Sequence, residues 1–174
     1  MENQNSKPFE ITDDLHASQG QRFINYIVDL ILVYLLIFLI GVIIAIVSVL
    51  TGSQALLDWF TDESSVLKNY MIFFLVWIPY YTFFESFTSR TVGKFITKTM
   101  VVNEDGSTKI DLGTAFKRTL CRIIPFEPFT MLGSNARGWH DSIPDTYVVR
   151  KAAFEEKKIL FYDFDQIGKP EENE

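Results

Sequence analysis

Three polar residues with the spacing of one helix face stand at the start of a long apolar run. Arg22, Asn25 and Asp29 lie three and four residues apart, so at 3.6 residues per turn they share a face. Glu85 lies near the end of a second apolar run, and we expect it at a similar depth. Carboxylates and an amide suit a hard cation or a proton relay. Asn25, Asp29 and Glu85 are therefore a candidate ion or solute site.

Two other interpretations of these residues stay open. Nearby basic residues (Arg22, Arg90 and Lys94) could pair with the carboxylates and clamp the apolar segments to the rest of the chain. Alternatively, Asp29 stands at the edge of the hydrocarbon and is only solvated there, because residues 30–50 alone are long enough to span a bilayer.

The triplet Trp139-His140-Asp141 is the second group that could do chemistry. An imidazole oriented by a carboxylate can act as an acid or base, but no activated nucleophile accompanies it, and Cys121 has no sign of activation. A tryptophan anchor beside a hydrogen-bonded loop aspartate explains the triplet better. Nucleotide-binding, metalloprotease and nucleophile-elbow motifs do not occur in the sequence. We therefore expect no enzyme and no cofactor.

Two apolar blocks must position these residues. The 174 residues are 48% hydrophobic and 22% charged, and the apolar ones are concentrated in residues 23–50 and 70–87. Each block approaches the roughly 20 residues that cross a bilayer, so both are predicted transmembrane helices, the second with a proline at Pro79. One cysteine and two histidines supply neither a disulfide framework nor a metal site. The net charge of −6 disfavours a nucleic-acid partner.

The basic residues predict the orientation. The segment 51–69 between the blocks carries one basic residue, whereas residues 88–151 carry ten. An excess of Lys and Arg marks the cytoplasmic side. We therefore expect a multi-pass protein of the cell (inner) membrane, with both termini cytoplasmic and residues 51–69 outside.

The rest of the chain reads as a small cap with flanking segments. Residues 100–103 and 146–150 are strand candidates that could pair, and Asp111 is a plausible N-cap for an amphipathic helix over 112–124. That helix either lies in the interface with its basic side toward anionic headgroups or packs on the inner end of the hairpin. Residues 123–132 are too short to span, so we expect an interfacial or re-entrant piece.

The predicted fold class is thus an all-α integral membrane protein. It is a two-transmembrane-helix hairpin with a cytoplasmic amphipathic helix and a short β-hairpin-like cap. A polar N-terminal segment (1–16) precedes the domain (17–151, with the cap at 88–151), and a charged C-terminal tail (152–174) follows it.

The order of these motifs resembles the RDD family of membrane proteins, which is named for one arginine and two aspartates. The resemblance rests on Arg22 and Asp29 at the first helix, then a T-x-G-K element at residues 91–94 with Gly93 and Lys94. A turn at 101–106, the basic helix and the closing G-x-H-D loop at 138–141 follow. It implies that Arg22, Asp29 and Asp141 are the family's namesake residues, with Gly93, Lys94, Trp139 and His140 in support. The family is associated with transport, although its function is described as uncertain.

Two functions remain as expectations. Transport of an ion or small solute would need a homo-oligomer or a hetero-complex with another membrane protein in the lipid bilayer, because two helices cannot enclose a pathway. The alternative is a non-transporting accessory or scaffold protein, in which Arg22, Asp29 and Asp141 lock the hairpin to the cap.

Overall fold

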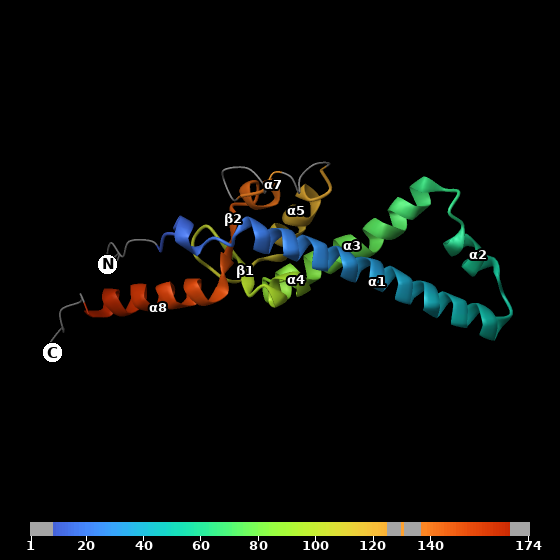
Figure 1. Ribbon diagram of the computed structural model, residues 1–174, viewed down its shortest axis with the longest axis horizontal. Coiled ribbons are helices and arrows are strands. Elements are labelled where there is room, and N and C mark those ends of the chain that lie inside the picture. Colours follow the sequence, from blue (N-terminus) through green and yellow to red (C-terminus); the bar gives the residue numbers. More distant parts are fainter. Residues whose placement is uncertain (1–8, 125–129, 131–136, 168–174) are drawn as a thin grey trace, which may run out of the picture.

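The computed structural model describes residues 9–124, 130 and 137–167. Its helices are connected in one elongated molecule, with η1 and α8 at one end and α2 at the other (Figure 1). In chain order the elements are η1 (Asp13–Leu15), α1 (Gln19–Thr51), α2 (Ala55–Thr61), α3 (Val66–Thr88), α4 (Val92–Ile96), β1 (Thr99–Asn103), α5 (Leu112–Cys121), α7 (Trp139–Ser142), β2 (Thr146–Arg150) and α8 (Lys151–Ile167).

Two helices are long and apolar enough to cross a membrane, α1 with 33 residues and α3 with 23. They contain the two predicted segments, 23–50 and 70–87, and extend a few residues beyond them. The start of α1 is fixed by a capping box, in which Ser18 and Gln21 exchange side-chain to backbone hydrogen bonds. Its end is fixed by Gly52, whose φ of +67° is left-handed backbone that favours glycine.

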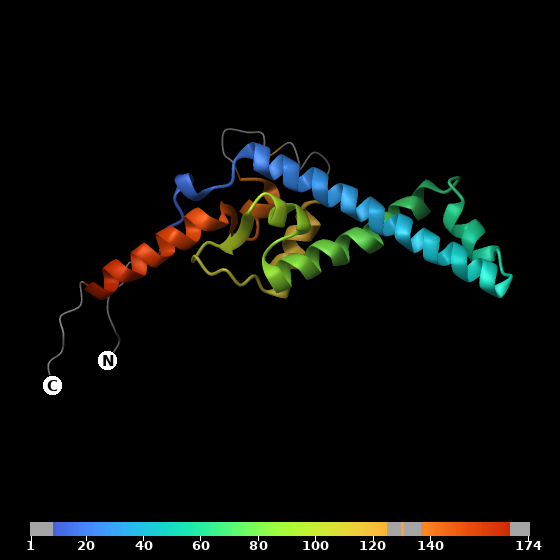
Figure 2. The ribbon, with the colours of Figure 1, turned by 60° about the horizontal axis from the view of Figure 1, so that its bottom comes forward.

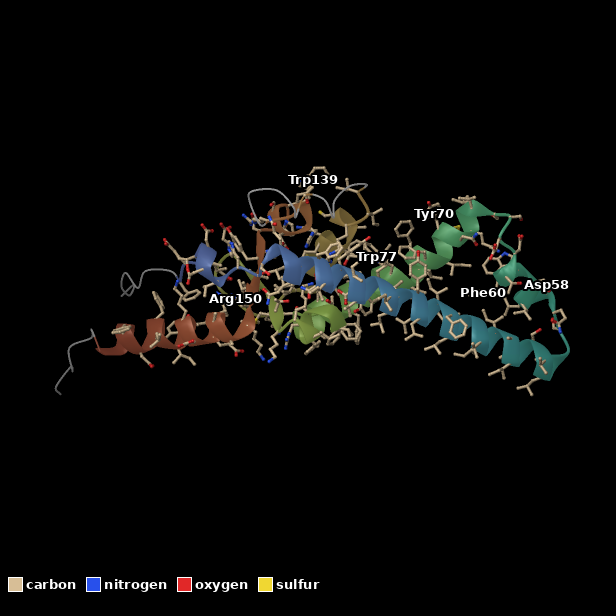
Figure 3. All side chains as sticks on the ribbon, in the orientation of Figure 1. Asp58, Phe60, Tyr70, Trp77, Trp139 and Arg150 are labelled. Carbon is tan, nitrogen blue, oxygen red and sulfur yellow. The ribbon has the colours of Figure 1, made fainter. Side chains whose placement is uncertain are left out.

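The two helices cross and then separate. At the crossing, Val33 of α1 packs against Trp77, Tyr80 and Tyr81 of α3. Towards α2 the helices diverge in both ribbon views (Figures 1 and 2). Trp77 lies near the crossing, whereas Tyr70 lies where the helices have parted (Figure 3). The sequence did not predict α2, which lies within the expected loop 51–69.

The predicted strand pair is present. β1 and β2 are antiparallel, with Thr99 opposite Arg150 and Asn103 opposite Thr146. The next element is α8, which the sequence did not predict. The sequence left open whether the charged C-terminal tail is folded. Phe9 and Leu15 from the N-terminal segment share a buried cluster with Phe154 of α8. These three residues therefore pack against Met100, Val102 and Val149 of the strand pair.

Helix α5 begins at the predicted N-cap, and the side that carries Arg118 faces α3. The Asp111 carboxylate caps it by accepting from the Thr114 amide at 3.0 Å, and it ends at Cys121 rather than Ile124. Arg118 is fully buried and faces α3. Of the two arrangements that the sequence left open, the structure has the second, in which the helix packs on the hairpin. Most of the expected re-entrant piece, 123–132, lies outside the described residues.

Candidate functional site

The polar face of α1 is buried. Arg22, Asn25 and Asp29 are 3%, 5% and 1% exposed, although they begin a helix whose other faces are open and apolar. Their shared face is the one that the spacing predicted. It points at the cap elements α4, α7 and β2 and at α3, which supply the partners described below.

Asp141 of α7 joins the start of α1 to α5. Arg22 donates from Nη1 to one carboxylate oxygen of Asp141, and Arg118 donates from Nη1 to the other at 2.7 Å. His140 Nε2 lies 3.4 Å from the same carboxylate. Burial alone would raise the pKa of Asp141, but the neighbouring imidazole and the two guanidinium groups outweigh it and hold that pKa well below its usual range.

Glu85 of α3 is surrounded by three cations. Its carboxylate is fully buried and accepts from Lys94 Nζ at 2.9 Å and from Arg118 Nε at 2.8 Å. Arg122 Nη2 is the third donor, at 2.7 Å. Because Arg118 contacts both Glu85 and Asp141, the pairs form one network that ties α1, α3, α4, α5 and α7 together. Burial lowers the pKa of the Lys94 ammonium despite the opposing charge of Glu85.

Asp29 is held differently, by neutral donors. Tyr80 donates its hydroxyl hydrogen to Oδ1 at 2.7 Å, and the Gly93 amide donates to the same oxygen at 2.8 Å. The Thr91 hydroxyl donates to Oδ2 at 2.6 Å. Within the described part of the chain no basic group forms an ion pair with Asp29. Its charge is therefore spread over three hydrogen bonds from α3 and from the start of α4.

Asn25 fixes the approach of α4 to α1. Its amide lies 2.5 Å from the Thr97 hydroxyl and 3.1 Å from the Thr99 hydroxyl. Gly93 packs directly on the α1 backbone, because a Cβ at this position would lie 2.5 Å from the Asn25 carbonyl oxygen. Only glycine permits this distance, which explains the residue before Lys94 in the T-x-G-K element.

The structure gathers some predicted residues and separates others. Arg22 and Asp141 meet, as do Glu85 and Lys94, whereas Asn25, Asp29 and Glu85 have different hydrogen-bond partners. Arg90 lies outside the network, donating to the Thr99 carbonyl at 2.9 Å. Trp139 is 44% exposed at the upper edge of the molecule (Figure 3).

Sequence reasoning missed four members of the site: Tyr80, Thr91, Arg118 and Arg122. The two arginines were visible on the amphipathic helix, but the sequence left open whether that helix faces headgroups or packs on the hairpin. Glu85 and Asp141 are two buried carboxylates, and the two long helices carry too few cations to pair with both. That shortage of cations indicates that a basic helix packs against them.

A small cavity lies between these elements. It has a volume of about 40 Å³ and is lined by Arg22, Asn25, Tyr26, Asp29, Trp77, Tyr81, Lys94, Arg122, His140 and Val148. A water molecule needs about 10–15 Å³ of such space, so the cavity has room for a few waters. Among the described residues that line it, Asp29 is the one carboxylate.

Two apolar helices of membrane-crossing length, joined at one end to a cap by a buried ion-pair network, define a helical membrane protein. A search of curated proteins and a search of solved structures each found no match. A sequence model of the RDD family matches residues 16–155. The chain belongs to the RDD family, as its motifs indicated.

Proposed function

We propose that this RDD protein is a non-transporting accessory or scaffold subunit of a membrane assembly. The observation that carries the proposal is the internal pairing of the polar cluster. Glu85 and Asp141 are both fully buried and are occupied by four cations of the same chain. Groups held in this way serve as a lock between helices, because moving any one of them strands a buried charge.

The surface that a partner would use lies at the other end of the hairpin. A groove of about 940 Å³ opens where α1 and α3 separate, and aromatic residues including Tyr34, Tyr70 and Phe73 line it. Thr61, Glu63 and Asn69 add polar groups at its outer end. This groove is where we propose that a membrane span of a partner protein packs.

The test is the composition and the activity of the intact complex. After gentle solubilisation, native mass spectrometry should find the chain in a stoichiometric complex with a different membrane protein. Liposomes containing that complex should show no ion flux that changes with Asp29→Asn. A homo-oligomer whose cation flux is lost in Asp29→Asn would overturn the proposal.

Transport of an ion or small solute by an oligomer is the second candidate, and Asp29 is the observation in its favour. This carboxylate is held by neutral donors and lines a cavity with room for water. Such a group can exchange a proton or a cation. Glu85 does not serve this purpose, because three cations already occupy it.

The basic residues support a topology with both termini in the cytoplasm. Three of the ten basic residues in 88–151 pair with Glu85 (Lys94, Arg118 and Arg122), and the other seven are available to mark the cytoplasmic side. The one in residues 51–69, Lys68, is itself buried and donates to the Trp59 carbonyl at 2.6 Å. Reporter fusions should place each terminus inside and an insertion at Glu63 outside.

We propose no catalytic role for His140. The carboxylate beside it is engaged by two arginines, so it positions helices rather than an imidazole for proton transfer. A His140→Ala variant should keep the wild-type phenotype wherever it still folds.

A further inference from the structure

Helix α5 has the reverse of the usual amphipathic arrangement. Its inward side carries Ala115, Arg118, Thr119 and Cys121, all buried. Its outward side carries Lys117 and an apolar stripe at helical spacing, with Leu112, Phe116 and Leu120 exposed by 64%, 45% and 43%. Ile123 and Ile124 continue the stripe and are also exposed. Water is a poor solvent for such a surface.

The contacts of α5 with α3 give its direction. Arg118 Nε meets Glu85 at 2.8 Å, and the Thr119 hydroxyl lies 3.2 Å from that of Thr82. Four residues after Arg118, the Arg122 guanidinium covers the Tyr81 ring at 4.6 Å. Residue numbers rise along α5 as they fall along α3, so α5 runs antiparallel to α3, away from the end of that helix.

The depth of these contacts in a bilayer follows from their position along the apolar run of α3. If its apolar run 70–87 lies in the hydrocarbon, Thr82 is five residues inside the boundary. At 1.5 Å per residue this is a depth of about 8 Å. Tyr80 and its partner Asp29 lie at about 10 Å on the same scale. The C-terminal half of α5 is then level with acyl chains, not with the aqueous phase.

We propose that α5 enters the bilayer beside α3, on the side of the two termini, and that its apolar stripe contacts lipid acyl chains. The stripe continues the lipid-facing surface of α3, because α5 packs along that helix while Phe83 and Phe87 remain exposed on it. The inward side of α5 at the same time supplies Arg118 and Arg122 to Glu85. The helix thus separates the ion-pair network from lipid, and the cap is embedded in the bilayer rather than wholly cytoplasmic.

This inference rests on the proposed span of α3, and the experiment tests the two separately. The full chain, with Cys121→Ala to remove its native thiol, is reconstituted into phospholipid vesicles and spin-labelled at one introduced cysteine. The test position is Leu120→Cys, and Leu112→Cys is a shallower position on the same stripe. Leu75→Cys, on the exposed middle of α3, reports the span. Glu104→Cys, in the exposed turn after β1, is the reference for a label that is exposed to the aqueous phase.

The readout is the accessibility of each label to oxygen, which concentrates in lipid, relative to a water-soluble nickel complex. We expect the ratio to rise in the order Glu104, Leu112, Leu120, with Leu120 close to Leu75. The inference is overturned if Leu75 is in lipid but Leu120 resembles Glu104, or if Leu120 is shielded from both reagents by a protein partner or second copy. A water-exposed Leu75 would overturn the span itself, and the inference with it.

A second measurement needs no substitution. The wild-type chain is irradiated in vesicles that contain a phospholipid with a diazirine on its acyl chain, and the adducts are located by mass spectrometry. Adducts on the α5 stripe as well as on α3 support the inference. Adducts on α3 with none on the α5 peptide contradict it.

Discussion

Replacing Glu85 with glutamine tests whether the ion-pair network holds the cap to the hairpin. The change keeps the shape of the side chain but removes a negative charge that meets three buried cations at 2.7–2.9 Å. Removing one partner of a buried pair costs about 3–5 kcal/mol, because the other charge stays buried without compensation. Stabilities of about 5–15 kcal/mol are typical, so the loss is a large fraction of the total.

Thermal unfolding in a mild detergent measures this effect. At about 2–4 °C per kcal/mol for a chain of this size, Glu85→Gln should lower the melting temperature by about 6–20 °C. The matched control is Glu155→Gln on α8, where the carboxylate is 53% exposed and lies 3.6 Å from Lys151. An exposed pair contributes about 0–1 kcal/mol, so the control should shift the midpoint by less than about 4 °C.

A double substitution separates charge from packing. If electrostatics dominate, Lys94→Met should cost less in the Glu85→Gln background than in the wild type, since it then removes a cation that has lost its partner. The reasoning is refuted if Glu85→Gln shifts the midpoint no more than Glu155→Gln does. Purely additive effects of the two substitutions would also contradict a charge network.

Three further substitutions test other contacts by the same unfolding assay. Gly93→Ala places a Cβ 2.5 Å from the Asn25 carbonyl oxygen and should destabilise by about 1–3 kcal/mol, whereas Gly20→Ala, where nothing lies closer than 4.0 Å, should not. Asp141→Asn should lower stability at pH 7 by about 3–5 kcal/mol. The pKa of Asp141 is lower in the folded than in the unfolded chain, so its contribution to folding stability is fully present above the unfolded pKa of about 4. That contribution is lost only as the pH falls further. The stability difference between Asp141→Asn and the wild type should therefore become smaller only in acid. Burial lowers the pKa of His16, so protonation favours the unfolded chain. Stability should fall as pH drops below about 6.5, and His16→Gln should reduce that fall.

Much of the fold could be predicted from the sequence, because the patterns that define its elements lie within short stretches of the chain. The hairpin helices follow from two uninterrupted apolar runs, and the N-cap Asp111 and the strand pair follow from short patterns of residue type. Helix α8 was not readable in this way, because its buried contacts come from the far end of the chain: Phe154 packs edge-on against Phe9 with ring centroids 5.5 Å apart. A segment ordered by distant partners carries little evidence of that order in its own sequence.

The site was only half readable for a different reason. Helical spacing placed Arg22, Asn25 and Asp29 on one face, and the family resemblance joined Arg22 to Asp141. The spacing on α5 identified an amphipathic helix equally well, but spacing cannot say which of its two faces meets the protein. That choice depends on the solvent, because ionisable side chains at membrane depth face the protein interior, whereas in water they face the solvent.

The reversed helix and the ion-pair network explain each other. Charged groups at membrane depth are costly unless they pair with one another, and the hairpin alone brings Arg22, Asp29 and Glu85 to that depth without matching them. The cap supplies what is missing: Arg118 and Arg122 for Glu85, Asp141 for Arg22, and neutral donors at Thr91 and Gly93 for Asp29. To deliver these groups α5 must turn Arg118 and Arg122 inward, and its apolar stripe is then left facing outward beside the exposed Lys117. The network thus accounts for the inward side of α5, and the proposed lipid contact accounts for its exposed apolar stripe.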